Sequence, residues 1–204
     1  MSCFVANAAS QGDREREFIV FHRSDRLLLR PIWPEDWRGV LTGISDEGVV
    51  RNLARAPWPY REQDARDFAA LPVDPMYPRF LITRARDAQV VGCIGIDPAP
   101  AEDGEETGTA EIGYWIARPF WGQGFATEAG RAVLEIARTL GYTRVVGSHF
   151  LDNPASGKVL EKLGFQPTGR VVERHSCGRG ERAPTAEFAL EFADERTRDA
   201  AEAA

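Results

Sequence analysis

Small side chains spaced two residues apart precede a long helical pattern in the segment PFWGQGFATEAGRAVLEIARTLGY. Gly122, Gly124 and Ala126 alternate here with Gln123 and Phe125. Small residues let another group approach the main chain closely, and a helix N-terminus presents unpaired N–H donors with about half a positive charge. The segment therefore predicts a site where the backbone holds an anion. The alternative is a tight strand-to-helix turn that needs glycine for steric reasons only.

Two other phosphate-binding patterns fit this turn less well. A P-loop needs Gly-Lys-Ser or Gly-Lys-Thr, which GFATEA does not contain, and the pattern GxGxxG fails because Thr127 stands at the third glycine. An anion would therefore be held by main-chain donors, without the lysine and magnesium of a nucleoside triphosphatase.

A second motif, DNPASGKVLEKLGF, has the signals of a short helix. Asn153 is a favoured N-cap, Pro154 suits the first helical position, and Gly164 suits the C-terminal stop. We therefore expect a helix over residues 153–164.

The motifs EIGYWI, WGQGFATEA and DNPASGKVLEKLGF, in this order, resemble the GNAT N-acetyltransferase superfamily, especially its RimJ/RimL-like branch of ribosomal-protein N-acetyltransferases. The likeness extends from Arg26 to Phe192. It implies acetyl-CoA as co-substrate, with its pyrophosphate on the glycine turn and its pantetheine arm between two splayed strands. It also implies an acyltransferase that needs no metal.

The resemblance implies cofactor contacts in three segments. Trp121 stands where the superfamily usually has Gln or Arg. This departure also resembles the RimJ/RimL-like branch, and it leaves the turn without a basic side chain at this position. The implied cofactor-binding residues are Tyr114, Trp115, Ile116, Trp121, Gly122, Gln123, Gly124, Phe125, Ala126, Thr127, Asn153 and Ser156.

Acetyl transfer to an amine needs a base, a polarised thioester carbonyl and a proton for the leaving thiolate. The resemblance implies direct transfer in a ternary complex, without an acyl-enzyme. Glu111 precedes the apolar run IGYWI and matches an acidic position on the family's central strand, so it is the favoured base. His149 is the alternative, because histidine is the side chain that most readily exchanges protons near neutral pH.

The usual acid of the superfamily is missing. Many members carry a tyrosine where this chain has Leu160, so Ser156 is expected to hydrogen-bond the thiolate, as in the RimJ/RimL-like branch. A main-chain N–H near Ile116 would polarise the carbonyl. Without the tyrosine, an acyl-CoA-binding module with little turnover is the alternative function.

The acceptor is expected to be a primary amine, either a protein N-terminal α-amine or a small-molecule amine. In this family the early helical region forms part of the acceptor groove. Its aromatic and acidic residues are Trp33, Trp37, Trp58, Tyr60, Glu35, Asp36, Glu62 and Asp64. Aromatic residues in such a region often belong to the core instead.

The hydrophobic periodicity predicts an α/β (α+β) fold with a mixed, mostly antiparallel sheet of about seven strands flanked by helices. The resemblance adds that the central strands are splayed. Strands are expected at 26–30, 78–85, 90–98, 109–117, 143–150, 168–176 and 185–192, and helices from residue 35 and at 46–57, 61–71, 126–140 and 153–164.

The 204 residues are expected to form one domain over residues 23–193, after a loose arm at 1–22 and before a polar tail at 194–204. Hydrophobic residues make up 43% of the chain, as in globular proteins.

The net charge of −6 argues against a nucleic-acid partner. Cys3, Cys93 and Cys177 have no metal-ligand spacing, so neither a structural zinc nor a disulfide framework is expected. No apolar run suits a membrane span or a signal peptide, which indicates a cytoplasmic protein. A homodimer is common in the family, but no heptad pattern supports it here.

Overall fold

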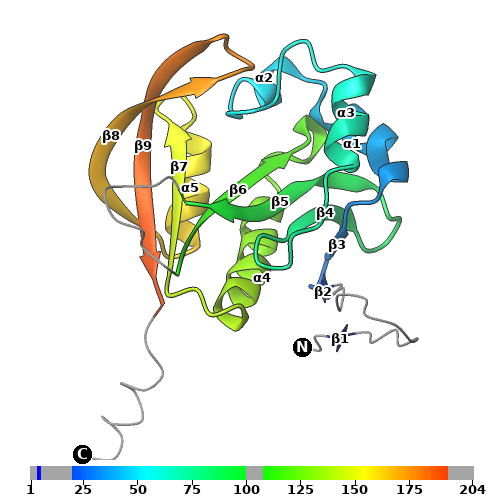
Figure 1. Cartoon of the computed structure of the whole chain (residues 1–204), viewed down its shortest axis with the longest axis horizontal. Coiled ribbons are helices and arrows are strands. Elements are labelled where there is room, and N and C mark those ends of the chain that lie inside the picture. Colours follow the sequence, from blue (N-terminus) through cyan, green and yellow to red (C-terminus); the bar gives the residue numbers. More distant parts are fainter. Residues whose placement is uncertain (1–3, 6–19, 100–107, 193–204) are drawn as a thin grey trace, which may run out of the picture.

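A single sheet of nine strands forms the centre of the computed structural model, which describes residues 4–5, 20–99 and 108–192. The strand order is β1-β2-β3-β4-β5-β6-β7-β9-β8 (Figure 1). The strands are β1 (Phe4–Val5), β2 (Val20–Arg23), β3 (Leu27–Pro31), β4 (Arg79–Arg84), β5 (Val90–Pro98), β6 (Thr109–Ile116), β7 (Arg144–Phe150), β8 (Gln166–Ser176) and β9 (Glu181–Glu191).

The predicted mixed, mostly antiparallel sheet is confirmed, because β6 and β7 form the one parallel pair among the described strands. The sheet has nine described strands, where about seven were expected. β2 begins at Val20 and pairs with β3, since the turn at Ser24 folds the chain back with a 3.0 Å bond from its N–H to the Leu27 carbonyl. This strand lies partly within the predicted arm. The predicted tail, 194–204, lies outside the described residues.

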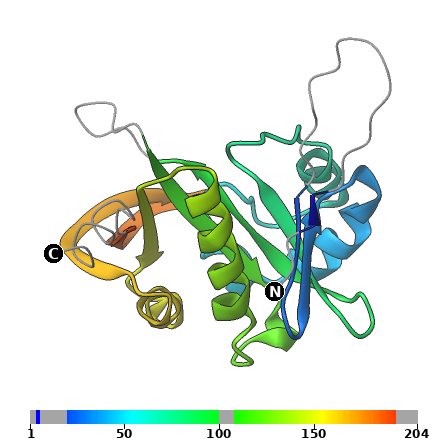
Figure 2. The same ribbon diagram turned by 90° about the horizontal axis from the view of Figure 1, so that it is seen from below.

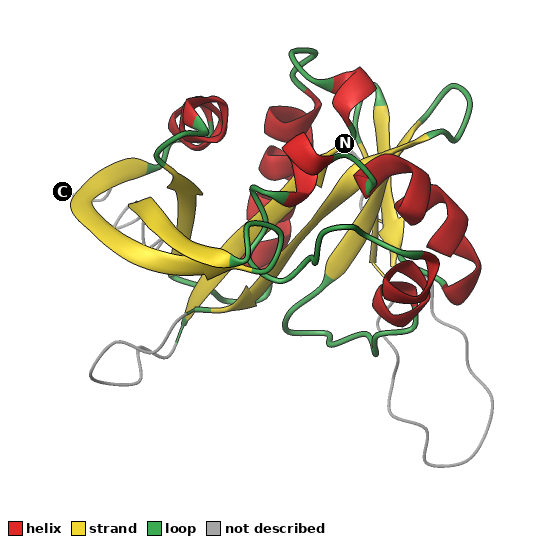
Figure 3. Ribbon diagram, turned by 90° about the horizontal axis from the view of Figure 1, so that it is seen from above, coloured by secondary structure: helices red, strands yellow, loops and turns green. Residues whose placement is uncertain are grey.

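Helices cover both faces of the sheet (Figure 2 and Figure 3). α4 and α5 lie on one face, and α1 and α3 on the other. Ala129, Val133 and Ala137 recur along the inner side of α4 and are fully buried, as the periodicity predicted. The helices are α1 (Trp37–Ile44), α2 (Glu47–Val50), α3 (Glu62–Ala69), α4 (Phe125–Thr139) and α5 (Pro154–Lys162), with 3-10 turns at Pro34–Asp36 and Arg118–Phe120.

The second predicted helix is shorter than expected. α2 ends at Val50, because the following backbone bonds to the tip of the β8–β9 hairpin instead of continuing the helix. The Cys177 N–H donates to the Ala54 carbonyl at 2.9 Å, and the Ser176 hydroxyl donates to the Leu53 carbonyl at 2.7 Å. The hairpin thus curves across to the α2–α3 connection (Figure 1).

The predicted splay lies between β6 and β7. These strands pair only through Thr109, Ala110 and Glu111. Beyond Glu111 they separate, so one edge of β6 is left without a neighbouring strand. This gap positions the site.

Candidate active site

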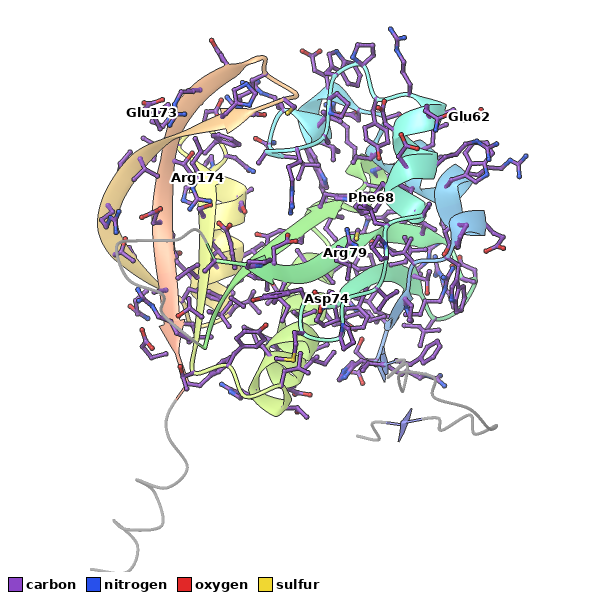
Figure 4. The ribbon with its side chains drawn as sticks, viewed as in Figure 1. Glu62, Phe68, Asp74, Arg79, Glu173 and Arg174 are labelled. Carbon is purple, nitrogen blue, oxygen red and sulfur yellow. The ribbon has the colours of Figure 1, made fainter. Side chains whose placement is uncertain are left out.

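One cavity of about 980 Å³ connects the glycine turn, the gap between β6 and β7, and the α3 side of the sheet. Phe68, Arg79 and Arg174 all line it, and Figure 4 shows them coming from opposite sides of the molecule's centre. The cavity is long enough to bring groups from the two faces of the sheet together at the gap.

At one end, the glycine turn has the geometry of an open cradle. Gly122 and Gly124 have φ of +73° and +78°, a left-handed region that favours glycine. Among the described residues other than chain neighbours, no heavy atom lies within 4 Å of a Cβ built on Gly122. For a Cβ built on Gly124, only Arg26 Nη2 does, at 3.6 Å. Gly124 is the N-cap of α4, so the first N–H groups of this 15-residue helix point into the turn. A phosphate group fits here.

The turn is tied to the β2–β3 hairpin from behind. Arg26 donates to the Gln123 carbonyl at 3.0 Å and forms a 2.6 Å ion pair with Glu128 in the first turn of α4. Burial alone would raise the pKa of Glu128, but hydrogen bonds from Ser24 and Arg26 lower it. The negative charge of Glu128 is therefore balanced by Arg26, so it does not repel an anion at the cradle.

The free edge of β6 offers main-chain hydrogen-bonding groups. The Ala117 N–H bonds to the Val91 carbonyl in β5 at 2.8 Å. Since backbone groups alternate between the two edges of a strand, the N–H groups of Tyr114 and Ile116 point the other way, into the gap. The Ile116 carbonyl accepts a 2.6 Å bond from the Trp121 indole, which fixes that ring beside the turn.

A pair of hydroxyl groups lies on the opposite wall, at the start of α5. The Tyr114 hydroxyl is 2.7 Å from the Ser156 hydroxyl. Burial raises the pKa of Tyr114 to about 12, although the bond with Ser156 acts the other way. The phenol is therefore held in its neutral, proton-donating form.

Asn153 occupies the N-cap of α5 as predicted, but its side chain does not cap the helix. Its amide lines the cavity and is available to a ligand. Leu160, at the position of the missing tyrosine, is 1% exposed and belongs to the core.

Glu111 lies at the other end of the gap and is held by charged neighbours. Its Oε1 pairs with Arg174 at 2.6 Å and lies 3.3 Å from the Ser148 hydroxyl. Arg174 also pairs with Glu187 at 3.1 Å. The predicted base thus lines the cavity while an ion-pair network holds its carboxylate in place.

His149 lines the same cavity but packs against α5. Its Nδ1 lies 2.9 Å from the Phe150 carbonyl, which assigns the ring proton to Nδ1. Its Nε2 lies 2.7 Å from the position of a Cβ on Gly157, so the absence of a side chain there makes room for the ring.

Of the residues expected at the site, Gln123 alone does not line this cavity. Its side chain donates to the Pro119 carbonyl at 3.0 Å, and it lines a smaller cavity of about 400 Å³ on the far side of the turn. Of the acceptor region, Tyr60 and Asp64 reach the large cavity. Trp37 belongs to the core, and Asp36 pairs with Arg30 at 2.6 Å.

The charged residues of the cavity that were not found from the sequence include Asp97, Arg55 and Arg174. Asp97 lies directly opposite Glu111 in the β5–β6 register and pairs with Arg55 at 2.5 Å. A carboxylate at the end of the apolar run VVGCIGIDP was the available signal for Asp97. Nothing local distinguishes the two arginines from other surface arginines.

Within the described ranges, no three His, Cys, Asp or Glu residues gather to hold a metal. The same residues include no helix long and apolar enough to cross a membrane. Burial raises the pKa of Cys93 to about 12, which makes its thiol unreactive.

Comparison with known proteins agrees with this geometry. Residues 26–166 match the family described as Acetyltransferase (GNAT) domain. The uncharacterized N-acetyltransferase YoaA of Bacillus subtilis is 32% identical over 150 residues, which are 72% of this chain and 82% of that protein.

Two solved structures show the same fold. The ribosomal-protein-S5-alanine acetyltransferase from Vibrio fischeri has a TM-score of 0.70 at 14% identity, covering 86% of this chain and 98% of that one. The Microcin C7 self immunity acetyltransferase MccE, solved with acetyl-CoA and AMP, has a TM-score of 0.68 at 18% identity, covering 83% and 94%. With the family match over most of the chain, these findings identify the protein as an acyltransferase of the GNAT acetyltransferase family.

Proposed function

We propose that this protein transfers the acetyl group of acetyl-CoA directly to a primary amine. One observation carries the proposal: a single cavity runs from an anion-binding turn, along a free strand edge, to paired carboxylates. The turn suits a pyrophosphate and the edge suits the amide groups of a pantetheine arm. MccE, which has the same fold, was solved with acetyl-CoA.

Different residues along the cavity have different roles in the proposed reaction. The N–H groups at Gly124 and in the first turn of α4 hold the pyrophosphate. The edge of β6 aligns the thioester, with the Ile116 N–H placed to polarise its carbonyl. Asn153 hydrogen-bonds the pantetheine arm.

The hydroxyl groups of Tyr114 and Ser156 stabilise the leaving thiolate. They lie 2.7 Å apart, so the phenol can donate to Ser156 while Ser156 donates to the sulfur. This pair takes the place of the tyrosine that Leu160 replaces, and it argues against the binding module without turnover.

The amine must lose a proton before it attacks, and two carboxylates are close enough to receive it. Glu111 was the residue favoured from the sequence, and Asp97 faces it across β5 and β6. His149 is less suited, because α5 packs against its Nε2.

Calorimetry with acetyl-CoA, and thiol release with a panel of amino acids, peptides, polyamines and aminoglycosides, test the proposal. We expect binding of acetyl-CoA and CoA release with at least one amine. Binding without turnover on any amine would support the binding module instead, and absence of binding would overturn both functions.

The variants Glu111→Gln and Asp97→Asn distinguish which of the two carboxylates is the base. If Glu111 is the base, its variant loses most of kcat and the rise of kcat with pH. If Glu111 only holds Arg174, its variant keeps that pH dependence.

A further inference from the structure

Asp97 holds the more accessible of the two carboxylates that face the reaction gap. Gly113 lies on β6 between Glu111 and Trp115, on the same side of the strand, and its surface is exposed. Apart from the chain neighbours of Gly113, Asp97 Oδ2 is the only heavy atom of the described residues within 4 Å of a Cβ built there, at 4.0 Å. The Asp97 carboxylate therefore overhangs the open part of β6 at Gly113.

The two carboxylates differ in how firmly their arginine partners hold them. Arg174 has a side chain only 25% exposed, and it pairs with Glu187 as well as Glu111. Arg55, the partner of Asp97, is 80% exposed and has no second carboxylate partner among the described residues. Exposed ion pairs add little to stability, so Asp97 can exchange this partner at little cost.

We propose that Asp97 binds the ammonium group of the acceptor and that Arg55 binds an anionic group on the same molecule, so that the acceptor is a free α-amino acid. This inference rests on the proposed function. An ammonium on Asp97 leaves the Arg55 guanidinium without its partner, and a carboxylate one carbon from the amine restores that partner. An amine without a carboxylate would leave the Arg55 guanidinium without a replacement partner.

The backbone over this end of the cavity also favours a small acceptor. The tip of the β8–β9 hairpin bonds to residues 51–54, and Arg179 and Arg51 both pair with Asp152, at 2.7 and 2.9 Å. Arg55 follows directly after this bridge. Such a bridge beside Arg55 favours a free amino acid over the N-terminus of a folded protein as the acceptor.

Acetyl transfer at this subsite starts from the ammonium form of the acceptor. The ammonium gives one proton to Asp97, which releases it to solvent. The nitrogen forms a bond to the acetyl carbonyl carbon, and the carbon–sulfur bond breaks. The second nitrogen proton neutralises the thiolate, which Ser156 and Tyr114 stabilise until then. One amide, one thiol and one proton result.

A matched acceptor series tests the proposal. Free L-amino acids, their C-terminal amides and their decarboxylated amines are each assayed by thiol release, beside short peptides. We expect at least one free amino acid to exceed its own amide and amine by tenfold or more in kcat/KM. An amide, amine or peptide that is equal or better, or no turnover of any free amino acid, overturns the acceptor class. Failure of acetyl-CoA to bind would overturn the proposed function instead.

Two variants assign the roles. Arg55→Gln should raise the KM of the free amino acid at least tenfold and change that of its amide less than threefold, with kcat preserved. Asp97→Asn should lower kcat/KM for both. Arg66→Gln is the control, because it removes another exposed arginine, paired with Glu62 at 2.8 Å, outside the cavity. Equal effects of Arg55→Gln on acid and amide would overturn its role.

Discussion

The two ends of the cavity present different chemical groups. The proposed cofactor end consists of main-chain features: positive-φ glycines, the N-terminus of α4 and a strand edge without a neighbour among the described strands. The proposed acceptor end consists of charged side chains, in the pairs Arg55–Asp97 and Arg174–Glu111. Backbone geometry suits a ligand shared by a whole family, whereas a few side chains can change the acceptor without disturbing the fold.

The largest effect is expected where the main chain is altered. Gly124→Asp should raise the Kd of acetyl-CoA by about 100-fold, roughly 2.7 kcal/mol, because the new carboxylate takes the first N–H groups of α4 and repels a phosphate. Aspartate tolerates a left-handed backbone, so the fold should persist. Calorimetry measures the Kd.

Gly169→Asp is the matched control, since Gly169 has φ of +79° against +78° at Gly124, with no neighbour within 4 Å of its Cβ position. It should leave the Kd unchanged. Equal weakening by both variants would mean that the glycine turn is not a binding element.

A smaller effect is expected where the two ends meet. Tyr114→Phe should lower kcat roughly 10- to 100-fold and leave the Kd of acetyl-CoA within threefold, because it removes a donor from the thiolate's partner. With its pKa raised to about 12, Tyr114 stays protonated, so its ionisation should cause no fall in kcat of the unmodified protein up to about pH 10.

Tyr142→Phe is the control for this variant. The Tyr142 hydroxyl donates to the Met76 carbonyl at 2.8 Å, outside the cavity, and the pKa of Tyr142 is likewise raised to about 12, mainly by burial. If both variants slow turnover alike, the Tyr114 effect is structural. If Ser156→Ala and Tyr114→Phe add fully in the double variant, the two hydroxyl groups do not act together.

The smallest effect concerns stability behind the glycine turn. The pKa of Glu128 is lowered from 4.5, so its contribution to folding is present above that value and is lost as pH falls through the lower folded pKa. Glu128→Gln should cost about 1 kcal/mol near pH 7 and less below pH 4. Urea midpoints measured across this range give the difference.

Glu62→Gln, in an exposed helical pair, is the matched control and is expected to change the urea midpoint at pH 7 less than Glu128→Gln does. A gap between the unmodified protein and Glu128→Gln that widens on acidification would contradict the assigned tether.

The glycine turn and the start of α5 could be predicted from the sequence because their signals are local. Gly122 and Gly124 alternate within a few residues, and Asn153 and Pro154 mark a helix start by their own backbone preferences. The sheet type and the splay followed from the element order and the family resemblance. β2 was missed because its four residues show no clear period and their pairing depends on a turn.

The acceptor end could not be predicted because its residues meet only in the folded chain. Asp97 and Glu111 become neighbours through the β5–β6 register, and Arg55 and Arg174 reach them from a loop and a distant hairpin. The contact between Tyr114 and Ser156 could be predicted only by knowing which face of β6 turns toward α5. No spacing along the chain encodes such distances.

The hydrogen bond from the Trp121 indole to the Ile116 carbonyl gives the protein an optical reporter. The ring is fixed beside the glycine turn, lines the cavity and is 45% exposed, whereas Trp115 on the same wall is buried. Indole emission depends on the polarity around the ring, so a ligand that covers Trp121 changes its fluorescence. With acetyl-CoA at the glycine turn as proposed, we expect its binding to be followed in real time without a label, separately from turnover.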